Sequence, residues 1–199
     1  MKKVIDELRL KLNNEKVVVT CSCGIDSATL LDLVLKAIPC ENVIVAHVNH
    51  NKRKESITEQ EYIESFCMEK NLKLEVLTLP KESNGNFQEW ARNKRYEFFE
   101  DVAKKNSAKY ILLAHHANDN LETILMRIMK TSSLKGYAGM EKCTIQNGVY
   151  IYRPLLNTPK EEIENYAKEN NIKYFEDSSN AKDDYTRNRI RHHIVPLLQ

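Results

Sequence analysis

Short apolar runs alternate with amphipathic stretches along most of the chain. Apolar, often β-branched runs predict buried strands over 16–21, 42–48, 72–79 and 109–114. Stretches with helical spacing predict helices over 4–12, 27–37, 58–70, 87–105 and 119–130. Strands that alternate with helices predict an α/β fold, a doubly wound parallel sheet with helices on both faces.

One of these helices and a further helix near the end of the chain carry signals of a helix start. Thr58 with Glu61 forms a capping box, and Thr158 with Glu161 forms another just before a further helix. Between them, 143–152 predicts a hairpin that turns at Asn147-Gly148. We therefore expect a core over about 15–132 and a hairpin and small helical extension over about 140–199.

Composition narrows the class of protein. The chain has 199 residues, 42% hydrophobic and 29% charged, with 5 Gly and 5 Pro, as in one globular domain. It lacks an apolar run near the roughly 18 residues of a membrane span, so no membrane partner is expected. Five Cys without a C-x-x-C pair favour a reducing, cytoplasmic setting. A net charge of +2 neither requires nor excludes nucleic acid.

Polar clusters follow three of the predicted strands, over 22–27, 47–53 and 115–120. Ligands of parallel α/β sheets bind beyond the carboxyl ends of the strands. The first cluster joins a strand to a helix, where free N–H groups attract an anion and Ser22, Gly24 and Ser27 suit a phosphate. Asp26 would repel that phosphate unless a cation lies between them, which suggests Mg²⁺. The alternative is an ordinary Ser/Asp helix cap.

The pattern Ser-x-Gly-x-Asp-Ser resembles the PP-loop of the ATP pyrophosphatases, which split ATP between its α and β phosphates. The resemblance implies an adenine nucleotide alpha hydrolase-like, Rossmann-type fold. It assigns ATP binding to the loop and to the end of the second strand, namely to Ser22, Cys23, Gly24, Ile25, Asp26, Ser27, His47 and Asn49. Cys23 stands where the family has glycine. A left-handed backbone there would cost about 1–2 kcal/mol, and a thiol at a helix start can be acidic and reactive.

Later motifs, in order, resemble the tRNA(Ile)-lysidine synthetases within that group. They lie at 47–53, 89–96, 114–123, 134–140, 153–156, 176–180 and 187–191. The resemblance implies that ATP adenylates carbon 2 of the wobble cytidine in the CAU anticodon of tRNA(Ile), and that L-lysine then replaces AMP. It also implies a homodimer, and a C-terminal tRNA-binding domain that lies outside this chain.

The residues suit this chemistry. Asp119 and Glu122 share one helix face and could hold the ammonium groups of lysine or accept a proton; the alternative is a solvated acidic helix start. Arg92 and Arg95 could stabilise the adenylate or pyrophosphate, or form a solvated basic face. His115 could bind phosphate or substrate. We expect Tyr96 in the core.

Basic residues near the end of the chain are candidate contacts to tRNA or phosphate, with a solvated surface as the alternative. They are Arg187, Arg189 and Arg191, and Arg53 joins them from the second cluster. Two other functions stay open. One is a tRNA thiolation enzyme, although Cys21-x-Cys23 is the only close cysteine pair, and the other is a non-catalytic nucleotide- or RNA-binding module.

Overall fold

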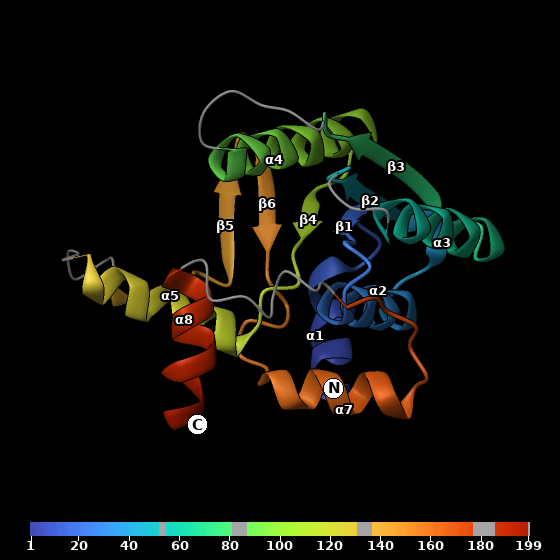
Figure 1. Cartoon of the computed structure of the whole chain (residues 1–199). Coiled ribbons are helices and arrows are strands. Elements are labelled where there is room, and N and C mark those ends of the chain that lie inside the picture. Colours follow the sequence, from blue (N-terminus) through green and yellow to red (C-terminus); the bar gives the residue numbers. More distant parts are fainter. Residues whose placement is uncertain (52–54, 81–86, 131–136, 177–185, 199) are drawn as a thin grey trace.

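The computed structural model describes residues 1–51, 55–80, 87–130, 137–176 and 186–198. It contains a six-stranded sheet in the order β3-β2-β1-β4-β6-β5 (Figure 1). The strands are β1 (Val17–Thr20), β2 (Val43–Asn49), β3 (Lys73–Thr78), β4 (Tyr110–Leu112), β5 (Cys143–Gln146) and β6 (Val149–Tyr152). Strands β1 to β4 pair in parallel, which confirms the α/β prediction.

Helices cover both faces of the sheet (Figure 1). The helices are α1 (Lys2–Leu12), α2 (Ile25–Ala37), α3 (Glu55–Glu69), α4 (Phe87–Lys105), α5 (Ala117–Met129), α7 (Lys160–Glu169) and α8 (Thr186–His193). Single 3-10 turns are η1 (Cys40–Asn42) and η3 (Val195–Leu197). Val17 and Val19 of β1 pack with α1, α2 and α3, whereas Val18 packs with α4. Both faces of this strand are buried, so its alternating side chains contribute to two core layers, one on each side of the sheet.

The hairpin prediction is confirmed, with Asn147 and Gly148 both at positive φ in its turn. The hairpin also joins the sheet, because β6 pairs in parallel with β4 and places Ile151 beside Ile111. The sheet thus continues beyond the core expected to end near residue 132. Since β6 runs parallel to β4, the chain after Tyr152 leaves from the same sheet edge as the loop after β1.

Two predicted capping boxes are wrong. Helix α3 begins at Glu55, so Thr58 lies inside it. Helix α7 has Pro159 as its N-cap, without a side-chain cap from its own segment. Asn118 of α5 accepts a hydrogen bond from the Lys160 N–H at 3.1 Å instead. A tertiary contact has therefore replaced the local cap, and it ties the starts of α5 and α7 together.

Helix α5 begins at Ala117, two residues before the predicted start, because Asp119 accepts a hydrogen bond from the His116 N–H at 3.1 Å. Helix α8 lies beside α5 (Figure 1). Among the helices that the structure describes, none is long and apolar enough to cross a membrane.

Candidate functional site

The loop between β1 and α2 is folded around the Ser27 hydroxyl. This oxygen accepts a hydrogen bond from the Ser22 N–H at 3.1 Å and donates one to the Gly24 carbonyl at 3.0 Å. The Ser22 hydroxyl lies 3.1 Å from the same oxygen. Gly24 is the N-cap of α2, without a side-chain cap. The first turn of α2 therefore offers its N–H groups to an anion at this loop.

Cys23 adopts the left-handed backbone, at φ 63°. Its side chain is buried, with Sγ 3.5 Å from the Glu59 carbonyl and 4.0 Å from Nδ1 of His47. Contact with the Cys21 thiol and burial both raise the pKa of Cys23. The interpretation of Cys23 as an acidic, reactive thiol is therefore wrong, because its environment disfavours the thiolate.

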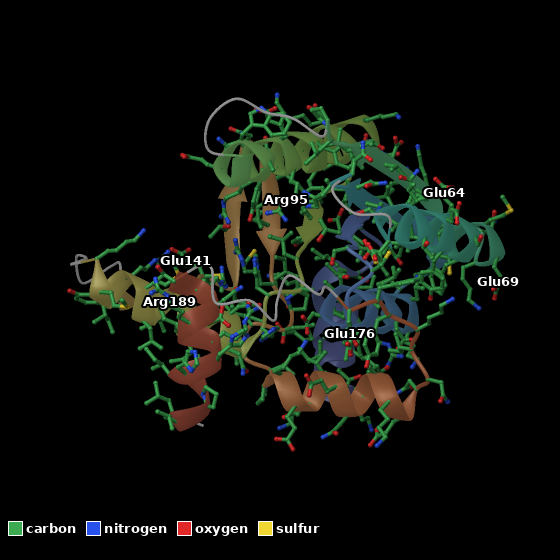
Figure 2. All side chains as sticks on the ribbon, in the orientation of Figure 1. Glu64, Glu69, Arg95, Glu141, Glu176 and Arg189 are labelled. Atoms are coloured by element: carbon green, nitrogen blue, oxygen red, sulfur yellow. The ribbon has the colours of Figure 1, made fainter. Side chains whose placement is uncertain are left out.

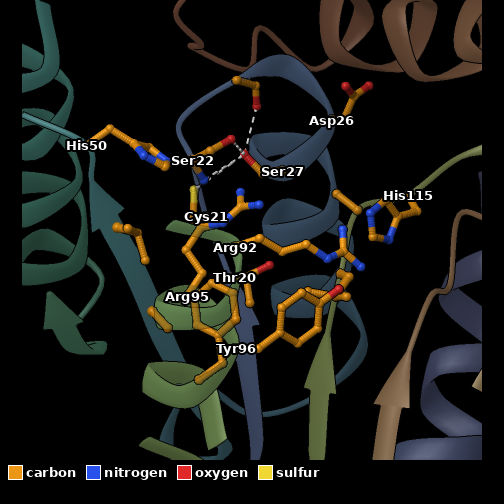
Figure 3. Close-up of a pocket in the computed structure, with 16 residues that line it drawn as sticks. Thr20, Cys21, Ser22, Asp26, Ser27, His50, Arg92, Arg95, Tyr96 and His115 are labelled. Carbon is orange, nitrogen blue, oxygen red and sulfur yellow. Dashed lines mark hydrogen bonds between the residues drawn. The ribbon is translucent and has the colours of Figure 1, made fainter. Parts of the chain in front are cut away.

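A cavity of about 250 Å³ opens in front of the loop, between the sheet edge and α4. Arg95 lies beneath α4, over the strands (Figure 2). Figure 3 shows side chains that line the cavity, among them Ser22, Asp26, Ser27, Arg92, Arg95 and His115. The structure thus gathers three sequence-separated groups, the loop, the α4 arginines and the end of β4, around one space.

Two side chains that line this cavity each have a buried polar atom without a partner among the described residues. Nε of Arg95 and Nδ1 of His115 are buried without a hydrogen bond to any described residue. Burial lowers the pKa of Arg95, and it lowers the pKa of His115 to about 4. His115 is therefore neutral near pH 7. A buried polar atom left unpaired costs about 1–3 kcal/mol, so both side chains carry a cost that a small rearrangement around a polar ligand would relieve.

Tyr96 lies where the core meets the cavity. Its ring packs against the core, as predicted, but it also lines the cavity. The Arg92 guanidinium lies 5.1 Å from the centre of that ring. Stacking on an aromatic ring orients a guanidinium, so Tyr96 helps to aim Arg92 at the cavity.

His47, Asn49 and Ile25 are not among the residues that line the cavity. Nδ1 of His47 donates to the Cys21 carbonyl at 2.8 Å, and burial lowers the pKa of its ring. The Asn49 amide donates to Gln60 at 2.7 Å and to the Ser56 carbonyl at 3.3 Å. Asn49 therefore holds the strand-to-loop turn instead of lining the cavity, which His50 does line.

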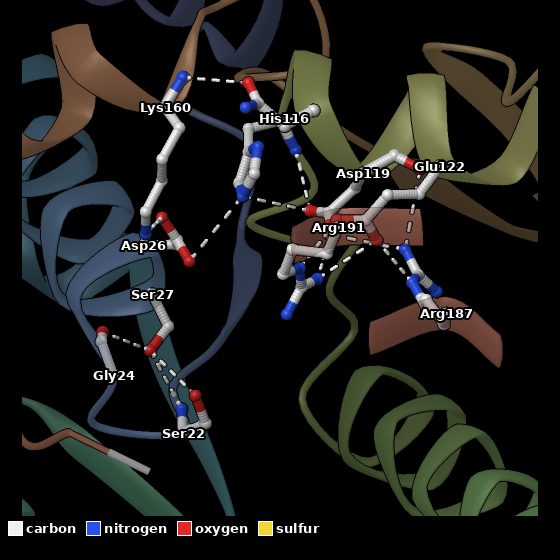
Figure 4. Close-up of polar contacts among 11 residues, drawn as sticks. Ser22, Gly24, Asp26, Ser27, His116, Asp119, Glu122, Lys160, Arg187 and Arg191 are labelled. Carbon is white, nitrogen blue, oxygen red and sulfur yellow. Dashed lines mark hydrogen bonds and ion pairs between the residues drawn. The ribbon is translucent and has the colours of Figure 1, made fainter. Parts of the chain in front are cut away.

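The predicted carboxylate pair forms a second centre, which we call the carboxylate cluster: Asp119, Glu122, Arg187 and Arg191 (Figure 4). Glu122 is 1% exposed and accepts from Nε of Arg187 and Nε of Arg191, both at 2.6 Å. Asp119 lies 3.2 Å and 3.4 Å from the same two guanidinium groups. The helix-face prediction is confirmed, and the two arginines neutralise the pair.

Burial opposes ionisation of Asp119, but His116 and Arg187 outweigh it and hold the pKa of that carboxyl below its usual range. Nε2 of His116 lies 3.4 Å from Asp119 and 3.8 Å from Asp26. His116 thus links the carboxylate cluster to the phosphate loop. Asp26 also pairs with Lys160 at 2.6 Å, a contact that no spacing in the sequence indicates.

The two other basic residues predicted to contact tRNA or phosphate are Arg189 and Arg53. Arg189 is exposed on α8 (Figure 2), and one of its nitrogens lies 3.4 Å from the Thr186 hydroxyl. Arg53 falls outside the described residues. No group of three or more His, Cys, Asp or Glu side chains that could hold a metal occurs in the part of the chain that the structure describes.

An anion-binding loop at the carboxyl edge of a parallel sheet, opening on a cavity with unpaired polar atoms, defines a nucleotide-binding α/β domain. The chain belongs to the PP-loop domain family, an ATP-binding family whose model matches residues 1–198.

Its curated relatives include tRNA(Ile)-lysidine synthases. The chain is 41% identical over 192 residues to that of Geobacillus kaustophilus, covering 92% of this chain and 41% of that protein. It is 37% identical over 206 residues to that of Bacillus subtilis, covering 100% of this chain and 44% of that protein. The chain thus spans less than half the length of these relatives.

Solved structures share the fold. The U34-tRNA thiolase NcsA from Methanococcus maripaludis with its [4Fe-4S] cluster matches with a TM-score of 0.76 at 18% identity, over 98% of this chain and 70% of that one. At this identity the likeness shows the fold alone. The thiolation alternative is not favoured, because the relatives with higher identity are lysidine synthases.

Proposed function

We propose that this chain carries the catalytic site of lysidine formation, in which ATP and L-lysine modify the wobble cytidine of tRNA(Ile) with a CAU anticodon. The observation that carries this proposal is the adjacency of two centres. A cavity with unpaired polar atoms lies beside the phosphate loop, and a carboxylate pair begins four residues after His115 on α5. The reaction has two steps: the first needs groups that bind the phosphates of ATP, and the second needs groups that bind the ammonium of lysine.

In the first step, the oxygen on carbon 2 of cytidine attacks the α phosphorus of ATP. The bond from that phosphorus to the bridging oxygen breaks, and pyrophosphate leaves. Ser22, Ser27 and the first turn of α2 would bind the phosphates. Arg92 and Arg95 would stabilise the negative charge that develops on them.

In the second step, the ε-amine of lysine attacks carbon 2, and the carbon–oxygen bond breaks to release AMP. The amine must lose protons as it attacks, and an ionised carboxylate can accept one. The lowered pKa of Asp119 keeps it ionised and suits it to hold an ammonium group, and Asp119 becomes a better proton acceptor once Arg187 and Arg191 leave it. The ammonium groups of lysine would replace the Arg187 and Arg191 contacts to the carboxylates, wholly or in part.

A divalent cation fits the site at Asp26. Carboxylate oxygens are the ligands that Mg²⁺ prefers, and this carboxylate already holds a cation, the Lys160 ammonium at 2.6 Å. Asp26 would hold Mg²⁺ together with phosphate oxygens, and the ion would neutralise phosphate charge.

Exposed Arg189 is a candidate contact to tRNA phosphates, and a homodimer stays a prediction.

The test is an AMP-release assay. The purified chain is incubated with Mg²⁺, α-labelled ATP and tRNA(Ile) with a CAU anticodon, with and without L-lysine. We expect AMP release that depends on both tRNA and lysine, and none with ornithine as the control amine. AMP release without lysine dependence, or none under any condition, would contradict the proposal.

A further inference from the structure

The contact between Lys160 and Asp26 has no assigned role. Asp26 lies in the first turn of α2, and Lys160 is the first residue of α7. They are 134 positions apart in sequence, yet Nζ of Lys160 lies 2.6 Å from Oδ1 of Asp26 (Figure 4). The pair therefore stands at the rim of the phosphate loop and not on a remote surface.

The backbone of Lys160 is held in place from two directions. Its N–H donates to Oδ1 of Asn118 at 3.1 Å, and the Ala117 N–H donates to the Thr158 carbonyl at 3.0 Å. The start of α7 is thus fixed against the start of α5, beside the carboxylate cluster. The Lys160 side chain is only 26% exposed, but its four-carbon stem lets the ammonium swing between neighbouring anions.

The balance of charge around Asp26 determines whether the Lys160 ammonium binds this carboxylate or a phosphate. Asp26 faces two nitrogen groups, Nζ of Lys160 and Nε2 of His116 at 3.8 Å. A phosphate at the start of α2 would be repelled by the Asp26 carboxylate unless a cation comes between them. When a divalent cation takes that carboxylate, the Lys160 ammonium loses its partner. The phosphates that arrive with the cation are then the nearest anions.

We infer that Lys160 is a phosphate-binding residue that leaves Asp26 and binds the β and γ phosphates of ATP, which become the pyrophosphate leaving group. This inference rests on the proposed function, because it requires ATP in the cavity. The ammonium offers three N–H donors to phosphate oxygens, and it stabilises the charge that pyrophosphate gains when its bond to the α phosphorus breaks. A purely structural ion pair between partly exposed groups would instead contribute at most about 1 kcal/mol to stability.

The test compares ligands that differ in their phosphates. The affinities of ATP, pyrophosphate and AMP are measured by calorimetry in the presence of Mg²⁺, for the whole chain and for Lys160→Met. We expect ATP and pyrophosphate to bind about tenfold more weakly to the variant, and AMP to change by less than about twofold. Lys168→Met, an exposed residue in the last turn of the same helix, should leave all three affinities unchanged.

Lys160→Arg keeps the charge and should recover part of the lost affinity for ATP and pyrophosphate. Unchanged ATP and pyrophosphate affinities in Lys160→Met, or an equal loss for AMP, would overturn the inference. AMP binding also reports whether each variant is folded. If the unaltered chain binds no ATP, both the proposed function and this inference fail. If it binds ATP and only the selective loss is missing, the inference alone fails.

Discussion

The cavity and the carboxylate cluster lie side by side but differ in how their polar groups are satisfied. In the cavity, Nε of Arg95 and Nδ1 of His115 are buried without partners among the described residues. In the cluster, both oxygens of Glu122 accept from guanidinium groups at 2.6 Å. The cavity is thus lined by side chains with unpaired atoms, whereas the cluster is already saturated by ion pairs, so a ligand there must exchange existing hydrogen bonds.

This difference indicates an order of events. Under the proposed function, ATP would bind at the cavity of the free protein, and the ion pair that it would displace there, that of Lys160 with Asp26, is partly exposed and weak. Lysine would face carboxylates that Arg187 and Arg191 already neutralise, so its gain in binding free energy would be small until one of these arginines binds another anion. Phosphates of ATP or tRNA are such anions. We therefore expect nucleotide binding before amine binding.

The largest effect should come from Asp119→Asn. The amide cannot accept a proton or balance an ammonium charge, so we expect lysine-dependent AMP release to fall by about 100-fold or more. ATP affinity should change less than about threefold, because Asp119 is not among the residues that line the cavity. Asp101→Asn, on the exposed side of α4, is the control. Full AMP release in Asp119→Asn would remove this residue from the chemistry.

Glu122→Gln should mainly lower stability. The substitution leaves two guanidinium groups without their closest carboxylate, and these groups are 37% and 33% exposed, so water screens part of the loss. We expect the free energy of unfolding to fall by about 2 kcal/mol in urea titrations. Glu164→Gln, exposed on α7, should change it by less than about 0.5 kcal/mol. An equal effect of the two substitutions would contradict the cluster's stabilising role.

Arg95→Met tests the other centre. Loss of one charged donor from the cavity should weaken ATP binding about tenfold. Stability should stay the same or rise, because an unpaired buried donor is removed. Lys94→Met, which breaks only an exposed ion pair with Glu97, should leave ATP affinity unchanged. Calorimetry that finds the two variants alike would show that Arg95 does not face the nucleotide.

His115 makes the cavity sensitive to acid. Its pKa falls from 6.5 to about 4 on folding, so below pH 6.5 the unfolded chain binds a proton that the folded chain does not. Stability from this residue is complete above pH 6.5 and is lost as pH falls toward 4. The melting temperature should therefore drop across this range, and less steeply in His115→Gln. If the melting temperature falls with pH equally steeply in both proteins, His115 is not a buried, neutral imidazole in the folded chain.

Cys23 should have the smallest effect on the cavity, because its thiol packs behind the loop. Cys23→Gly and Cys23→Ala both remove the thiol, but only glycine relieves the left-handed backbone at φ 63°. We expect the glycine variant to be more stable than the alanine variant by about 1 kcal/mol in urea titrations. Both should bind ATP within about twofold of the unaltered chain, and a large loss would place the thiol at the nucleotide.

The sequence predicted the strands and the phosphate loop well because their signals are local. The β-branched run of β1 and the Ser/Gly/Asp turn after it each need only neighbouring residues. The contacts of Arg191 with Glu122 and of Lys160 with Asp26 join residues 69 and 134 positions apart, so no local period reveals them. The wrong cap at Thr158 has the same origin, since Asn118 reaches α7 from another helix.

The most direct test of the two-centre account follows the α-phosphate label without lysine. The chain is mixed with Mg²⁺, α-labelled ATP and tRNA(Ile) with a CAU anticodon, and label on the tRNA is measured before and after lysine is added. The account predicts labelled, adenylated tRNA that accumulates without lysine and releases AMP once lysine arrives. Label that never reaches the tRNA, or that leaves at the same rate without lysine, would contradict it.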